Sequence, residues 1–218
     1  MSCSPATKSH RQMTRKAHEI MDATSPSSPF DIEELKFLAI KAMRADRDED
    51  AIRLLKDAVA QAPENGELLY LLGMAHSNVA MVDRAVGELT LALALAPNLI
   101  NARFQLGLLL FTGRDFDKSA AVWQPLLGAL AQDDPLRIFS IGLTQVGKND
   151  LQAAIVTLEG GIAVCRNEDL NEDMRNIVVE AQRYLAEAGN LGDTKSAADE
   201  PTQQHVLLSG YSQSPERH

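Results

Sequence analysis

The sequence predicts an all-α protein built from repeated pairs of helices, and two observations carry this prediction. Aromatic residues make up only 5% of the 218 residues, while Ala and Leu are abundant, and this composition favours helix over sheet. Residues of matching type also recur at one interval along the chain. A small residue that follows Leu or Ile stands at positions 39, 73, 107 and 142, which gives intervals of 34, 34 and 35.

Three further columns repeat at the same intervals. They are Ala51, Ala85, Ser119 and Ala154; Leu55, Leu89, Trp123 and Leu158; and Ala58, Ala92, Leu126 and Gly161. Antiparallel helices that pack closely need small residues where their backbones approach and larger apolar residues between those points. We therefore expect the second helix of each unit to pack against the first at positions 39, 73, 107 and 142.

The first segment, residues 1–30, is rich in Ser, Thr and Pro and is predicted to be a polar leader. Its apolar residues at helical spacing favour a short amphipathic helix at 10–22: Met13, Ala17, Ile20 and Met21. Four basic residues precede the first acid, Glu19: Lys8, Arg11, Arg15 and Lys16. This pattern fits either a solvated basic leader or a transit peptide.

The repeat domain is expected at 31–189, in four units with a helix pair each: 32–65, 66–99, 100–134 and 135–168. Asp31 and Glu34 form an N-cap signature for the first helix, and Pro63 and Pro97 close the first two units. Pro125 lies inside the second helix of the third unit and is expected to kink it. A cap helix is predicted at 170–189, followed by a flexible tail at 190–218 with an apolar island at 206–211.

Residues 32–167 resemble the tetratricopeptide repeat (TPR) family. The second unit matches the family pattern best, through Leu69, Leu72, Gly73, Ala85, Leu89, Ala92 and Pro97. The third unit departs from the pattern at Ser119, Leu126 and Ala131. The resemblance implies a right-handed α-solenoid of about four TPR helix pairs, in which the first helix of each unit lines a concave groove.

Stepping along these first helices at the repeat interval gives four rows of groove residues. The rows are Lys36, Ile40 and Met43; Tyr70, Met74 and Ser77; Phe104, Leu108 and Phe111; and Phe139, Leu143 and Val146. Within each row the spacing of four and then three residues places the side chains on one helix face. An exposed apolar stripe usually marks an interaction site, and we expect Tyr70, Phe104, Phe111 and Phe139 to supply most of the contact. The alternatives are that these residues pack between units, or that the groove face is displaced by one residue from these rows.

The stretch GLTQVGKN at residues 142–149 is one residue short of a phosphate-binding loop, because Asn149 stands where Ser or Thr is needed. Its first glycine is in register with Gly73 and Gly107, and the segment before it has a helical pattern rather than that of a strand. We therefore interpret Gly142 as a packing residue. The five histidines are scattered, and no Ser/His/Asp or Cys/His set has a meaningful spacing. No catalytic residue, metal site or cofactor is expected.

The composition of the chain restricts the classes of partner that it is expected to bind. The net charge of −9 argues against nucleic acid, and the chain has no run of about 18 apolar residues that would span a membrane. Cys3 and Cys165 lie far apart in sequence, so a disulfide is not expected and a reducing, cytoplasmic location is the default.

The sequence thus predicts a non-catalytic scaffold or chaperone-like adaptor that binds an apolar peptide or helix of a partner protein. Lys36 is the only groove residue suited to a carboxylate clamp, so an acidic C-terminal peptide is not the expected ligand. The alternative is a self-assembling protein, a homo-oligomer whose groove is filled by its own tail or by another copy.

Overall fold

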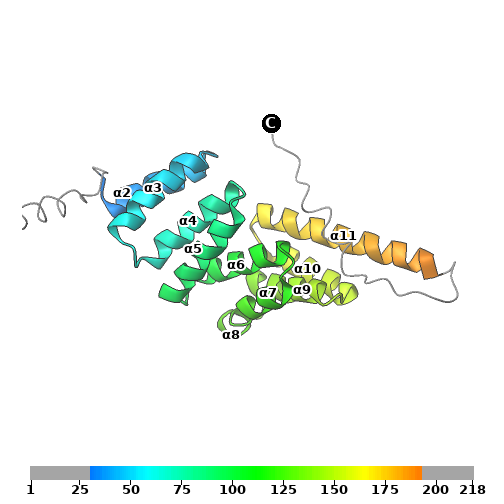
Figure 1. Cartoon of the computed structure of the whole chain (residues 1–218). Helices are drawn as coiled ribbons and strands as arrows, with labels where there is room; N and C mark the ends of the chain where they lie inside the picture. The colour runs from blue at the N-terminus through cyan, green and yellow to red at the C-terminus, as the bar shows by residue number, and fades with distance from the viewer. Residues whose placement is uncertain (1–29, 193–218) are drawn as a thin grey trace, which may run out of the picture.

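The computed structural model of the protein describes residues 30–192, and helices joined by short turns make up this region (Figure 1). In chain order the helices are α2 (Ile32–Met43), α3 (Asp48–Gln61), α4 (Gly66–Asn78), α5 (Val82–Leu95), α6 (Ile100–Thr112), α7 (Phe116–Trp123), α8 (Leu126–Ala129), α9 (Pro135–Gly147), α10 (Leu151–Val164) and α11 (Glu168–Gly192). The all-α fold of repeated helix pairs is confirmed. The helix expected at 10–22 and the apolar island at 206–211 lie outside the described residues.

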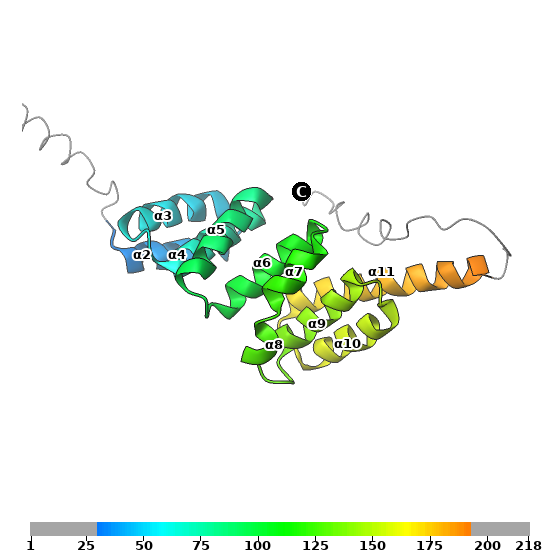
Figure 2. The ribbon, with the colours of Figure 1, turned by 60° about the horizontal axis from the view of Figure 1, so that its bottom comes forward.

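Four helix pairs follow one another along the array: α2–α3, α4–α5, α6–α7 and α9–α10. Helix α11 packs against α10, and Figure 2 shows its later turns extending past the ends of α9 and α10. No helix between residues 30 and 192 combines the length and the apolar character that a membrane crossing requires.

The two helices of each pair are joined by the same backbone turn. One residue in each turn adopts a left-handed conformation: Asp46, Ala80, Arg114 and Asn149, with φ between 53° and 65°. The next residue's N–H then donates to a carbonyl five residues earlier, as from Met81 to His76 at 2.9 Å. This is the Schellman arrangement, which satisfies carbonyls at the end of a helix. The repeat seen in the sequence is therefore also a repeat of backbone geometry.

Glycines allow the helices of a pair to approach closely. A Cβ placed on Gly73 would lie 3.0 Å from Leu89 Cγ, and one on Gly142 would lie 2.6 Å from Leu158 Cδ2. In the third unit a Cβ on Gly107 would lie 2.1 Å from the indole Nε1 of Trp123, so the larger indole occupies the space over the glycine. The predicted packing of small residues against the Leu and Trp column is confirmed.

The apolar core consists of three successive clusters rather than one centre. The first joins α2, α3 and α4. The second joins α5 and α6 with Tyr70 of α4 and Val122 of α7, and the third runs from α6 to α11. Each element therefore depends mainly on its neighbours, as in other repeat arrays.

Pro125 interrupts the second helix of the third unit, as expected. Helix α7 ends at Trp123 and α8 begins at Leu126, because proline has no N–H to continue the ladder. In a continuous helix the carbonyl of Val122 would accept from the N–H of Leu126. Here it accepts from Nη1 of Arg103 at 3.4 Å, and Nη2 of the same guanidinium donates to the carbonyl of Pro97 at 2.8 Å. A side chain from α6 thus helps to satisfy the backbone at the break.

Candidate functional site

The twelve predicted groove residues do not form one exposed stripe. Five of them are buried within the chain: Phe104 (1% exposed), Phe111 (1%), Phe139 (0%), Leu143 (0%) and Val146 (7%). The expectation that these five offer a contact surface is therefore wrong. The three phenylalanines contact residues of their own units, Trp123 and Gly161, within a cluster that also spans units. All five belong to the core cluster that runs from α6 to α11.

The two phenylalanines of α6 are buried because they flank the indole of Trp123. The ring centroids of Phe104 and Phe111 lie 6.0 Å and 6.1 Å from that of Trp123, and Phe111 also meets Phe116 edge-on at 5.4 Å. The indole N–H donates to the carbonyl of Phe104 at 3.0 Å. Gly107, between the two phenylalanines on the same helix, leaves room for the indole, so this face of α6 turns toward α7.

Phe139 is buried for a similar reason in the fourth unit. A Cβ on Gly161 of α10 would lie 2.4 Å from Phe139 Cε1, so the phenyl ring lies directly against the glycine backbone. Leu143 and Val146 follow on the same face of α9 and are buried with it. This row therefore belongs to the packing between α9 and its neighbours.

The other seven predicted residues are half-buried and keep part of their surface in solvent. Leu108 packs at the margin of the large core cluster. The remaining six lie on two first helices in contact with each other, and we call them the α2–α4 face: Lys36, Ile40, Met43, Tyr70, Met74 and Ser77. Met and Tyr side chains adapt to varied apolar partners, because the thioether is flexible and the phenol combines an apolar ring with a polar end.

The charged residue of this face is already engaged. Nζ of Lys36 lies 3.2 Å from Oε2 of Glu67 and 3.4 Å from Oε2 of Glu33, and the first of these contacts links α2 to α4. The hydrogen bond to Glu67 raises the pKa of Lys36 above its ordinary value, so the ammonium stays protonated and paired at neutral pH. Burial raises the pKa of Tyr70, which keeps its phenol neutral. The α2–α4 face therefore presents apolar and neutral groups beside a compensated lysine.

The near phosphate-binding loop is the end of a helix. Gly142 packs against Leu158, as interpreted from the sequence, and a Cβ on Gly147 would lie 3.1 Å from Cβ of Phe116 in the preceding unit. Lys148 is exposed, and Asn149 holds the left-handed position of the turn. Both glycines serve helix packing, and no strand precedes them within residues 30–192.

Two titratable groups elsewhere in the described region have clear structural partners. His76, 1% exposed, places Nδ1 at 2.6 Å from Oε2 of Glu88 on α5 and ties the two helices of its pair together. Glu168 pairs with Arg175 at 2.8 Å, and this hydrogen bond lowers the pKa of the carboxyl. Between residues 30 and 192, no three His, Cys, Asp or Glu side chains converge so as to hold a metal ion.

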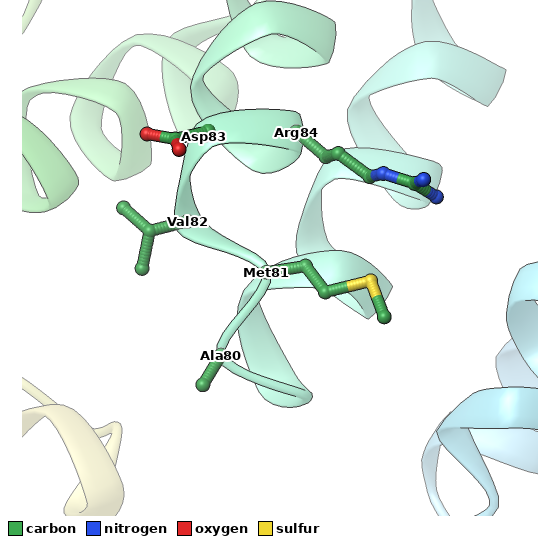
Figure 3. Close-up of a pocket in the computed structure, with 5 residues that line it drawn as sticks. All are labelled: Ala80, Met81, Val82, Asp83 and Arg84. Atoms are coloured by element: carbon green, nitrogen blue, oxygen red, sulfur yellow. The ribbon is translucent and has the colours of Figure 1, made fainter.

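A second surface was missed by the sequence analysis. The α4–α5 turn has the sequence Val79-Ala80-Met81-Val82 and borders a cavity lined by residues 80–84 (Figure 3). Met81 and Val82 are 46% and 43% exposed. The signal is visible in the sequence when the four turns are aligned at the repeat interval, because the other three turns contain charged residues.

Comparison with known proteins agrees with this architecture. No protein-family model matches the sequence. The chain is 31% identical over 117 residues to the BBSome complex member BBS4 of Bos taurus, an alignment that covers 54% of this chain. The chain spans about a fifth (22%) of the length of this curated relative.

Two solved structures have the same arrangement of helices. The APC/C hetero-tetramer Cut9–Hcn1 superposes with a TM-score of 0.64 at 19% identity, covering 90% of this chain and 37% of that one. The TPR2B domain of yeast Sti1, solved in complex with an Hsp70 peptide, superposes with a TM-score of 0.50 at 11% identity, covering 55% and 97%. With its repeated turns, glycine columns and stacked helix pairs, the chain has the tetratricopeptide repeat fold that its sequence predicts.

Proposed function

We propose that the protein is a non-catalytic scaffold that holds an apolar segment of a partner protein on the α2–α4 face. The observation that carries this proposal is the partial exposure of Ile40, Met43, Tyr70 and Met74 on two adjacent first helices. If these positions only faced solvent, polar residues would be expected there. Because Glu33 and Glu67 compensate the charge of Lys36, the six residues of this face offer no free cation to an acidic segment. We therefore infer that the partner segment is apolar.

The extent of the proposed site differs from that expected from the sequence. Because Phe104 and Phe111 are buried, an Asp at either position would place a carboxylate in the core and would test folding rather than binding. Substitutions on the α2–α4 face avoid this problem. Gln is similar in length to Met and removes the apolar contact without adding charge.

The test is affinity capture by the intact chain, compared by quantitative mass spectrometry with the Ile40→Gln/Met74→Gln variant. We expect the variant to lose its partner while its helical circular dichroism is unchanged. Val156→Gln is the matched control, because Val156 is 71% exposed on α10, in the last helix pair of the array. Equal capture by the two variants would exclude the α2–α4 face as the site.

Self-assembly is the second candidate, in which the tail covers this face within one chain or between copies. The apolar residues 206–211 favour it, since they form a lone apolar island in an otherwise polar segment, 190–218. Removing residues 193–218 would then raise capture of the partner. Unchanged capture after this deletion would argue against coverage by the tail.

A further inference from the structure

The α4–α5 turn differs in chemistry from the equivalent turns of the other units. The aligned segments are Ala45–Asp48, Val79–Val82, Gly113–Phe116 and Lys148–Leu151. Only the second has no polar side chain, and its Met81 and Val82 leave nearly half of their surface exposed. Turns on a protein surface are ordinarily polar, so this one exposes an apolar patch where the fold does not require it.

Two features of this turn are unfavourable for the isolated fold. Ala80 occupies the left-handed position with φ 57°, a conformation that disfavours a residue with a Cβ. Met81 is the N-cap of α5 and makes no side-chain capping bond. Asp115 and Asp150, at the equivalent positions, accept from the N–H groups of Lys118 and Ala153. A polar residue at position 81 would be better for the isolated fold.

The neighbouring α2–α3 turn is acidic and lies against the α4–α5 turn. Nδ2 of Asn78 donates to Oδ1 of Asp48 at 2.8 Å, and residues 46–50 line a cavity together with Val79. Asp50 pairs with Arg47 and Arg53, whereas Asp46, Asp48 and Glu49 form no ion pair within the described part of the chain. We call residues 46–50 and 79–82 together the turn surface.

The two parts of the turn surface are complementary to a basic, apolar segment. Figure 3 shows the side chains of Met81 and Arg84 on the side of the turn that faces the first helix pair, with Val82 and Asp83 on the other side. Arg84 is a basic group on this side, and Arg47 and Arg53 both pair with Asp50, so the acids of this surface left without an ion pair among the described residues are Asp46, Asp48 and Glu49. A ligand for this surface therefore combines apolar side chains with excess positive charge.

We propose that residues 8–21 of the same chain dock on the turn surface. This segment carries Lys8, Arg11, Arg15 and Lys16 against a single acid, Glu19, and it has apolar residues at helical spacing. Residues 22–29 connect it to Phe30, and these eight residues extend over up to about 27 Å. Helix α2, which separates Asp31 from the α2–α3 turn, has 12 residues and is about 18 Å long, so the connection is long enough.

The proposal is tested on the full chain by paramagnetic broadening. The sequence has two cysteines, and with Cys165→Ser a nitroxide can be placed on Cys3 alone, next to the docking segment. We expect the amide signals of residues 46–50 and 79–82 to broaden relative to the reduced label. The broadening should fall severalfold in 1 M salt, where the screening length is about 3 Å.

Two variants and a mixture complete the experiment. Met81→Ser/Val82→Ser should remove the broadening at residues 46–50, and Val156→Ser, a loss of another exposed apolar side chain, should leave it unchanged. Mixing isotope-labelled, untagged chain with tagged, unlabelled chain should give no broadening.

Three results would overturn the proposal. They are unbroadened signals of the turn residues, equal broadening in the double Ser variant, and broadening in the mixture, which would assign the site to a second copy. The proposal does not depend on partner binding by the α2–α4 face, so either can fail alone.

Discussion

Two adjacent glycines near the end of α10 have different surroundings, and the difference decides what each contributes. The Cβ of an alanine at position 161 would lie 2.4 Å from Phe139 Cε1, far inside van der Waals contact. At position 160 a Cβ would meet nothing within 4 Å. The burial of Phe139 therefore requires glycine at position 161, whereas Gly160 only lowers the helix propensity of α10.

The pair gives a prediction with an internal control. Gly161→Ala should lower the free energy of unfolding by about 1–3 kcal/mol, because the phenyl ring must leave its position. Gly160→Ala should raise it by roughly 0.5–1 kcal/mol, because alanine loses less backbone entropy in a helix. Urea denaturation followed by circular dichroism measures both. Changes of the same sign would contradict the packing described here.

Ala80 gives a second test at the scale of single residues. Ala80→Gly should stabilise the protein by about 0.5–1 kcal/mol, since glycine adopts φ 57° without the Cβ penalty. Ala94→Gly, at an exposed position in the last turn of α5, should destabilise it by roughly 0.5 kcal/mol. The unfolding temperatures of the two variants should therefore shift in opposite directions. A loss of stability in Ala80→Gly would contradict a left-handed conformation at Ala80.

At the scale of elements, the broken helix of the third unit is held by Arg103. This residue stands at the position of Leu69 in the second unit, since 69 and 103 differ by the interval of 34. Its guanidinium donates to the carbonyls of Pro97 and Val122, whereas a leucine at this position would make only apolar contacts. The arginine and Pro125 are thus coupled departures from the repeat pattern.

This coupling is measurable with a double-mutant cycle. Arg103→Met should lower the free energy of unfolding by about 1–2 kcal/mol, because the carbonyls lose their donor. In a Pro125→Ala background α7 can continue into α8, and the N–H of Leu126 can bond to Val122. The cost of Arg103→Met should then shrink by roughly 0.5 kcal/mol or more. Additive effects in denaturant titrations would disprove the compensation.

The sequence pattern predicts the elements better than it predicts their surfaces. Periodicity identifies residues that share a helix face, and it correctly places Gly73, Gly107 and Gly142 at close helix contacts. It does not show which neighbour that face meets. Trp123 in a leucine column and Gly161 in a column of small residues change the space around Phe104 and Phe139, and their effect depends on three-dimensional distances. The buried and exposed rows are therefore indistinguishable in sequence.

At the scale of the whole molecule, the three core clusters divide the array into unequal parts. The third cluster joins the buried phenylalanines to α9, α10 and α11, so the C-terminal half is a packed unit. The α2–α4 face lies at the other end, where Ile40, Met43, Tyr70 and Met74 stay partly exposed beside a buried core. Binding at this end would leave the large core unchanged, as expected for a rigid scaffold.

The central claim is that the α2–α4 face binds an apolar segment. Its most direct measurement is calorimetric titration of the full chain with the partner segment identified by capture, over a range of temperatures. We expect a negative heat-capacity change from burial of apolar surface, and a loss of affinity of about tenfold or more, equivalent to about 1.4 kcal/mol, in Ile40→Gln/Met74→Gln. Val156→Gln should bind like the unmodified chain. Equal affinities for all three chains would contradict the account.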